Sequence, residues 1–185
     1  TTQTKGNKIT CYEADSGTSE AKKIVQYIRT HSKDINLSEM AILYRTNAQS
    51  RIFEEALMHA SIPYRLVGGT KFYERKEVKD VIAYLRFAIN NMDLVSYQRI
   101  IKLGKRRFEA FQNWLIKQKP DELATQNPAT VLKEILETTT YLEKYKRNTE
   151  ENADKTANVS ELLSVATQFE NISEFLENIA LIQDN

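Results

Sequence analysis

The chain has 185 residues, 41% of them hydrophobic, which is enough for one or two compact units. Its 26 basic and 25 acidic residues nearly cancel, so the net charge of +1 gives no overall attraction to polyanions. The single cysteine excludes an intramolecular disulfide, and neither histidine has a Cys or His neighbour at zinc-ligand spacing. Without a long apolar run or a signal peptide, the sequence predicts a cytoplasmic protein with no membrane contact and no metal site.

The first half of the chain predicts strands that alternate with helices. Short apolar or alternating runs cover 8–13, 40–44 and 64–67, and helical spacing of apolar residues covers about 19–30, 48–60 and 78–89. This order predicts an α/β unit over residues 1–90, with a three-stranded parallel sheet and right-handed crossovers. An incomplete sheet leaves an edge unpaired, so we expect dimers through that edge.

The second half, residues 91–185, predicts helices and no strand. Six stretches have apolar residues at helical spacing, and proline-containing or polar connectors separate them: 94–101, 108–116, 129–136, 141–147, 159–169 and 172–182. We therefore expect an all-α region after Asn90 and Asn91.

The charged residues are unevenly distributed along this second half. A basic run without any acid holds Arg99, Lys102, Lys105, Arg106 and Arg107. Beyond residue 150 acids dominate, and Lys155 is the one basic residue there. Such an arrangement would orient a protein on a polyanion, and an ordinary solvated helix surface explains it equally well.

Two polar blocks follow predicted strands of the first half. Residues 43–52 read LYRTNAQSRI, and residues 68–75 read GGTKFYER. Each block places cationic or amide side chains where a strand gives way to a helix, and such positions favour phosphate. Arg45, Asn47 and Lys71 are the candidate phosphate ligands. The alternative is that Asn47 caps a helix while Arg45 and Lys71 are ordinary surface cations.

Both blocks, in this order and at this separation, closely resemble the UvrD/PcrA/Rep group of superfamily 1 DNA helicases. The similar stretches are 40–51 and 67–86, at the start of the motor subdomain called 2A. The resemblance implies a partial RecA-like 2A fold for residues 1–90 and part of the helical 2B insertion for residues 91–185. It also implies that Arg45, Asn47 and Lys71 contact the backbone of single-stranded DNA.

The resemblance adds weaker candidates for DNA contact. Tyr44 and Phe72 flank the blocks and could stack on bases, although aromatic residues beside strands more often belong to the core. Lys105, Arg106 and Arg107 are candidates for contact with duplex DNA through the helical region.

The chain lacks the residues that bind ATP in such helicases. It contains no G-x-x-x-x-G-K-[ST] sequence, and its one Gly-Lys pair is Gly104-Lys105. We therefore expect no catalytic residue and no bound cofactor in this chain, with ATP and Mg²⁺ bound elsewhere in a parent enzyme. The first residue is Thr rather than Met, as expected of an internal fragment. The parent is expected to be a 3′-to-5′ ATP-dependent DNA helicase of repair or replication.

One departure from the family pattern affects the second half. Lys105 to Arg107 leads directly into Phe108, where the family usually has a PKRGIG-like turn and further helices. The 2B region is therefore naturally shortened, trimmed, or joined across missing segments, and it lacks the turn whose backbone touches duplex DNA in the family. Two other functions fit the sequence: a non-catalytic DNA-binding or protein-interaction module, and the helicase part of a helicase-nuclease.

Overall fold

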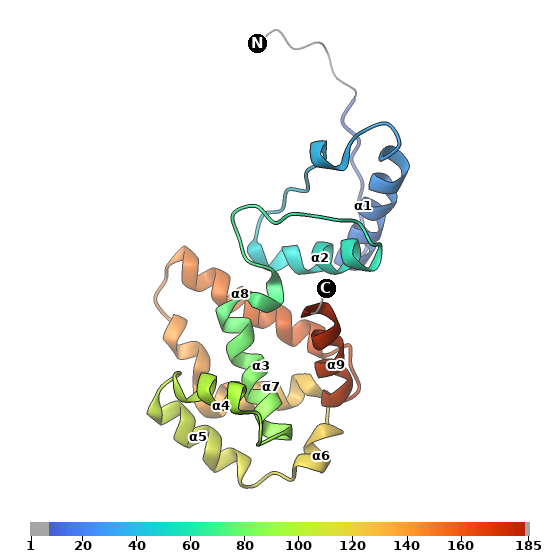
Figure 1. Cartoon of the computed structure of the whole chain (residues 1–185). Coiled ribbons are helices and arrows are strands. Elements are labelled where there is room, and N and C mark those ends of the chain that lie inside the picture. Colours follow the sequence, from blue (N-terminus) through green and yellow to red (C-terminus); the bar gives the residue numbers. More distant parts are fainter. Residues whose placement is uncertain (1–7, 184–185) are drawn as a thin grey trace. The chain divides into compact units, whose positions relative to one another are not determined.

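The structure, a computed structural model, describes residues 8–183, and these form helices without any strand (Figure 1). The α-helices are α1 (Gly17–His31), α2 (Ser50–His59), α3 (Lys76–Ile89), α4 (Leu94–Ile101), α5 (Lys105–Leu115), α6 (Pro120–Ala124), α7 (Pro128–Thr139), α8 (Glu150–Ala166) and α9 (Ile172–Gln183). Short 3₁₀ helices are η1 (Leu37–Glu39), η2 (Asn47–Gln49), η3 (Phe72–Glu74) and η4 (Tyr141–Tyr145). The ends of the two expected regions, residues 1–7 and 184–185, lie outside the described residues.

The expected three-stranded parallel sheet is wrong, because the segments assigned to its strands carry exposed side chains and no ladder. Ile9 is 99% exposed, Leu43 93% and Val67 79%. A strand satisfies its backbone groups only with a neighbouring strand, whereas a helix satisfies them within its own segment. Apolar runs alone therefore did not create a sheet among residues 8–183. The expected dimer through a sheet edge loses its basis with the sheet.

The described residues divide into two compact units. The first comprises the residues up to Leu43 together with Ile52–Tyr64, and the second comprises Tyr44–Arg51 together with Arg65 onward. Residues 65–90 were expected within the unit of residues 1–90. By contacts they group with the helical second unit. α2 begins in the second unit and continues into the first.

The first unit contains α1 and most of α2 and has a small core. The buried apolar residues are Ala21, Ile28, Phe53 and Leu57. Gly17 allows the close approach of the two helices, because a Cβ at this position would lie 2.7 Å from Ile52 Cδ1. Arg29 Nη2 donates a hydrogen bond to the Ala60 carbonyl oxygen at 3.1 Å, which ties the end of α1 to the end of α2.

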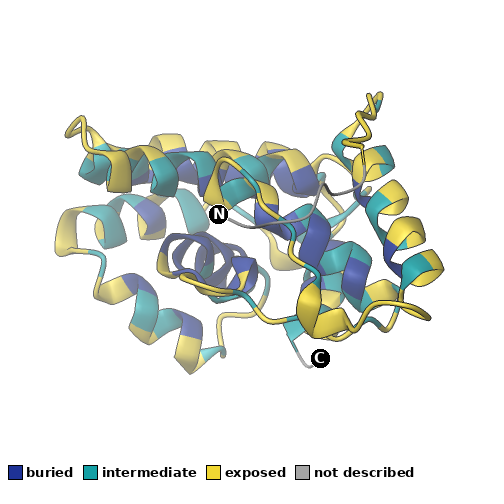
Figure 2. Ribbon diagram, turned by 90° about the horizontal axis from the view of Figure 1, so that it is seen from above, coloured by how far each residue is buried: buried dark blue, intermediate teal, exposed yellow. Residues whose placement is uncertain are grey.

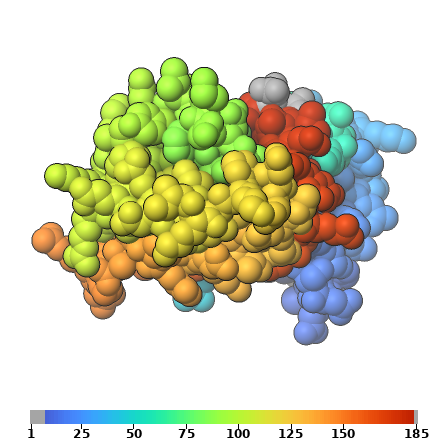
Figure 3. All heavy atoms as spheres, turned by 90° about the horizontal axis from the view of Figure 1, so that it is seen from below, coloured from blue at the N-terminus to red at the C-terminus, as the bar shows by residue number. Residues whose placement is uncertain are grey.

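The second unit is built around α3. This helix is apolar on most of its circumference, and a helix with such a pattern is stable only when other elements surround it. α4, α6, α7 and α8 all contact α3. Its fully or nearly buried apolar residues are Val78, Val81, Ile82, Ala83, Tyr84, Leu85, Phe87 and Ala88. In this unit the buried positions gather on the inner faces of the surrounding helices (Figure 2), and α4 to α7 form much of its surface seen from below (Figure 3).

Helix starts in the second unit follow local sequence signals. Asp93 accepts a hydrogen bond from the Ser96 backbone N–H at 3.0 Å at the start of α4. Asn127 accepts from the Ala129 and Thr130 backbone N–H groups at the start of α7, where Pro128 takes the first helical position. Side-chain oxygens of this kind satisfy N–H groups that the first turn leaves without partners. Helices are present at the six stretches expected beyond Asn91, although 141–147 forms the 3₁₀ helix η4, α8 begins at Glu150 rather than at 159, and α6 was not expected.

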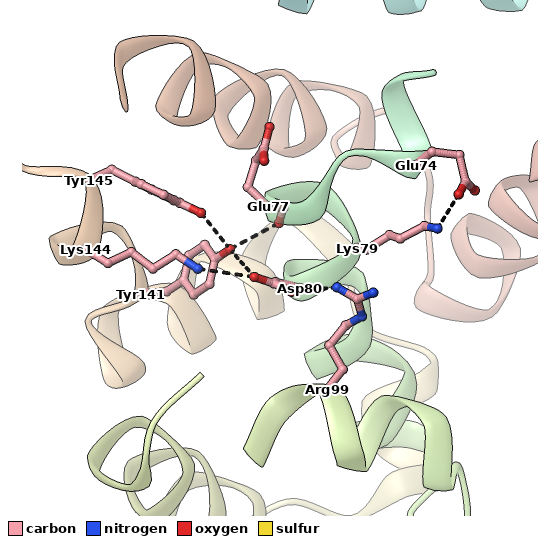
Figure 4. Close-up of polar contacts among 8 residues, drawn as sticks. All are labelled: Glu74, Glu77, Lys79, Asp80, Arg99, Tyr141, Lys144 and Tyr145. Atoms are coloured by element: carbon pink, nitrogen blue, oxygen red, sulfur yellow. Dashed lines mark hydrogen bonds and ion pairs between the residues drawn. The ribbon is translucent and has the colours of Figure 1, made fainter. Parts of the chain in front are cut away.

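A buried carboxylate connects α3, α4 and η4. Asp80, 1% exposed, accepts hydrogen bonds from Arg99 Nη1 at 2.8 Å, Tyr141 Oη at 3.0 Å and Lys144 Nζ at 3.2 Å (Figure 4). Burial, with the negative charge of Asp80 adding to it, raises the pKa of Tyr141. Burial lowers the pKa of Lys144, against the opposing effect of Asp80.

None of the described helices is long and apolar enough to cross a membrane.

Candidate nucleic-acid interface

The first polar block forms a turn that enters α2 through η2. Gln49 Oε1 accepts hydrogen bonds from the backbone N–H groups of Arg45 and Thr46, both at 3.0 Å. Thr46, rather than Asn47, takes the N-cap position of η2. Asn47 is therefore not needed as the cap, and its exposed side chain is available for other contacts.

Asn47 makes two contacts with distant segments. Its side-chain Nδ2 donates to Asp154 Oδ2 of α8 at 2.6 Å. Its carbonyl oxygen accepts from Arg75 Nη1 at 2.9 Å. The side chain of Arg45, two residues earlier, is exposed.

The second polar block places Lys71 at the start of η3. Gly68, at φ +80°, adopts a left-handed backbone conformation that favours glycine, so the loop turns there. Lys71 is exposed and occupies the N-cap position of η3. The carbonyl oxygen of the preceding Thr70 accepts from Arg75 Nε at 3.2 Å.

Arg75 thus joins the two blocks. One guanidinium group bonds the Asn47 carbonyl of the first block and the Thr70 carbonyl of the second. Arg75 is 8% exposed and also donates to Ser50 Oγ and Asn158 Oδ1, both at 2.7 Å. The structure therefore brings the backbone at Asn47 and the residue before Lys71 around one side chain.

α8 contributes a row of side chains to this arrangement. Asp154, Asn158 and Glu161 follow one another at helical spacing along α8, and each contacts the first block or Arg75. Glu161 Oε1 pairs with Arg51 Nη2 at 2.7 Å. This row of α8 side chains could not be found from the sequence, because it lies in a polar segment without a recognisable motif, about a hundred residues after the blocks that it contacts.

The aromatic candidates differ in exposure. Phe72 is 1% exposed, and its ring meets Tyr73 edge to face with centroids 5.1 Å apart. A base can stack only on an exposed face, so we leave Phe72 out of the proposed interface. Tyr44 is half-buried.

The basic run lies in the first turn of α5. Lys105 and Arg106 are exposed, and Lys105 Nζ lies 3.8 Å from Glu109 Oε1. Arg107 is half-buried and donates from Nη1 to the Leu103 carbonyl oxygen at 3.2 Å. The positive end of the helix dipole disfavours cations at this position, so an anion close by would stabilise the turn. Lys105 and Arg106 stay candidates for contact with duplex DNA.

Comparison with known proteins assigns the chain. A family model described as the UvrD-like helicase C-terminal domain matches residues 1–118. The chain therefore belongs to the UvrD-like helicase family. This confirms the expected resemblance, which depended on the LYRTNAQSRI and GGTKFYER blocks.

Two curated relatives of this UvrD-like chain are named as helicases. The ATP-dependent DNA helicase PcrA of Staphylococcus epidermidis is 53% identical over 102 residues, which cover 55% of this chain and 14% of the relative. The ATP-dependent DNA helicase PcrA of Staphylococcus aureus strain Mu50 is 32% identical over 232 residues, which cover the whole chain and 32% of the relative. The chain thus spans at most about a third of the length of the curated relatives it matches. The longer match has 232 positions against 185 residues, so the S. aureus protein has additional residues inside the matched region.

Proposed function

We propose that this UvrD-like chain is part of a 3′-to-5′ ATP-dependent DNA helicase and contributes contacts to single-stranded DNA. Its family membership supports a DNA helicase parent, for which we propose a role in repair or replication in the cytoplasm. The observation that carries the proposed DNA contact is the guanidinium of Arg75, which both blocks share. It bonds the carbonyl of Asn47 and the carbonyl of Thr70, the residue before Lys71. The shared side chain joins the backbone of the two blocks that carry the exposed Asn47 and Lys71, and we propose that these blocks meet DNA together.

The chemistry of these groups suits a grip without sequence preference. Lys71 and Arg45 supply positive charge for phosphate oxygens, and the Asn47 amide supplies an uncharged donor. Contacts of this kind hold the nucleic-acid backbone and do not distinguish bases. A translocating helicase needs such contacts, because it must move over every sequence that it meets.

Nucleotide chemistry is proposed to reside in other parts of the parent protein. The chain has no phosphate-loop sequence, and a P-loop ATPase needs that loop, a metal-binding acid and charge-stabilising arginines around one nucleotide. ATP and Mg²⁺ therefore belong to the parent enzyme in this proposal, and the chain alone should hydrolyse no ATP.

The proposed DNA contact can be tested by alanine variants in the intact protein that carries this sequence. Lys71→Ala and Arg45→Ala should weaken binding to labelled single strands of every sequence alike. Each should also reduce the dependence of log K on log salt by about 0.7, the value expected for one lost phosphate contact. Asn47→Ala should weaken binding without changing that slope, because an amide releases no counterion.

Lys117→Ala is the matched control, since it removes one exposed lysine at the end of α5. If the Lys71 and Arg45 variants bind and respond to salt as the control does, these residues are surface groups and the proposal is wrong.

Arg45 needs a second measurement, because a phosphate on a nucleotide presents the same chemistry as one on DNA. Weaker ATP binding with unchanged DNA binding in Arg45→Ala would assign that residue to nucleotide instead.

A further inference from the structure

We infer that Arg75 is a positioning residue, which sets the spacing of the two DNA-facing segments. This inference rests on the proposed function and names the residue on which its geometry depends. Arg75 itself is buried and does not touch DNA in this proposal. It acts through the Asn47 backbone and through Thr70, the residue before Lys71.

The planar guanidinium makes this role geometrically specific. Nε donates to Thr70, Nη1 to Asn47 and Asn158, and Nη2 to Ser50, so each nitrogen is directed at a different acceptor. The angles between these N–H groups are fixed by the covalent structure of arginine. A lysine would present a single nitrogen, which cannot reach both carbonyl oxygens with the same separation.

A second buried group, the Asn158 amide, orients the Arg75 side chain. Asn158, 3% exposed, accepts from Arg75 through Oδ1 and donates through Nδ2 to Glu77 Oε1 at 2.6 Å. Arginine can only donate and an ionised carboxylate can only accept, so this pair of partners fixes which way the Asn158 amide points. Glu77 of α3 therefore holds the Asn158 amide, and Asn158 of α8 in turn holds the guanidinium.

The consequence for binding is a coupling between Asn47 and Lys71. With Arg75 in place, both segments hold their positions before DNA arrives, and little ordering remains to be done on binding. Without the guanidinium group of Arg75, each segment moves independently and must be ordered separately by the DNA. Loss of Arg75 should therefore weaken the contacts of Asn47 and Lys71 together, although both residues are still present.

A double-mutant cycle in the intact protein separates this role from a purely structural one. Arg75→Lys should reduce affinity for labelled single-stranded DNA about tenfold, a typical coupling between groups in one network. In a background that already carries Asn47→Ala and Lys71→Ala, the same change should have little further effect. Equal losses in both backgrounds would show that Arg75 does not act through these residues, and would overturn the inference.

Two further variants keep the test decisive. Asn158→Ala removes the acceptor that aims Arg75 and should weaken DNA binding in the same direction, with the same dependence on Asn47 and Lys71. It replaces Arg75→Lys in the cycle if the latter does not fold. Arg99→Lys is the control for exchange of a hydrogen-bonded arginine, since Arg99 pairs with Asp80 elsewhere in the unit; its loss of affinity should be small and the same in both backgrounds.

The proposed function and this inference fail in different ways. If Asn47→Ala and Lys71→Ala leave DNA affinity unchanged, the proposed contact is wrong and the inference falls with it. If those variants weaken binding while Arg75→Lys and Asn158→Ala do not, the contact stands and the positioning role is wrong.

Discussion

Asn47 donates its side-chain amide to the Asp154 carboxylate at 2.6 Å, although 107 residues separate the two in sequence. The amide that we propose to meet a DNA phosphate is thus occupied by a carboxylate of α8. Carboxylate and phosphate oxygens are both anionic acceptors, so they compete for the same N–H group. If Asn47 meets DNA as we propose, the Asp154 carboxylate of α8 competes with the DNA phosphate for this amide.

Removal of the Asp154 carboxylate should increase DNA affinity. Asp154→Ala frees the Asn47 amide and removes a negative charge beside the proposed phosphate path, so we expect binding about two- to fivefold tighter at low salt. The gain should shrink as salt is raised, because part of it is repulsion. Fluorescence titration of single-stranded DNA at several salt concentrations measures both effects.

Glu151→Ala is the matched control for this variant. Glu151 is an exposed acid of the same helix and pairs with Lys155 rather than with Asn47. If both variants tighten binding equally, the effect of Asp154 is that of its charge alone.

Loss of the Asp80 carboxylate should destabilise the helical unit. Asp80→Ala would leave Tyr141 and Lys144 without their buried acceptor and would remove the ion pair with Arg99. Breaking a buried ion pair from one side costs about 3 kcal/mol of unfolding free energy. Denaturant unfolding measures the change.

An exposed carboxylate on η4 provides the comparison. Glu143 pairs with Lys146 at the surface, and solvent screens such pairs. Glu143→Gln should leave the midpoint of unfolding nearly unchanged, and a loss as large as that of Asp80→Ala would show that burial is not the cause.

The stability of the helical unit should fall in alkaline solution. Burial raises the pKa of Tyr84 from 10.0 to about 12. Above pH 10 the unfolded chain loses this proton while the folded chain keeps it, so the folded state binds more protons and unfolding becomes more favourable. Tyr84 alone contributes a slope of about 1.4 kcal/mol per pH unit until its folded pKa is reached.

Tyr84→Phe isolates the contribution of this hydroxyl. The hydroxyl oxygen is buried without a hydrogen-bond partner among the described residues, so its removal should be tolerated at pH 7. Above pH 10 the variant should gain stability relative to the original protein. The measurement is the free energy of unfolding of both proteins at several pH values between 8 and 12. A difference between the two proteins that stays constant over this range would contradict the prediction.

The start of α5 should depend on a glycine. Gly104 has φ +114°, a conformation that residues with a Cβ rarely adopt, while the nearest atom to a new Cβ would be Arg107 Nη1 at 3.9 Å. Gly104→Ala should therefore cost about 1–3 kcal/mol through backbone strain alone. Gly69→Ala is the control, because a Cβ there would be in ordinary contact at 3.5 Å; a comparable loss in that variant would exclude backbone strain as the cause.

The sequence by itself determined the family and most of the helices. The LYRTNAQSRI and GGTKFYER blocks identify the family, and α4 begins and ends where its apolar spacing predicts. Both results depend on information that lies within one stretch of chain. A helix closes its hydrogen bonds over four residues and is capped by neighbours such as Asp93, so local sequence is enough to place it.

Only the tertiary structure decided what depends on distant segments. The apolar runs near Ile9 and Leu43 predicted strands, yet a strand needs a partner and the described residues provide none. The same holds for the candidate interface, where Arg75 and Asp154 meet the first block from positions 28 and 107 residues away from Asn47. Hydrogen bonds between such positions leave no periodic pattern in a sequence, because their geometry exists only after the surrounding helices have packed.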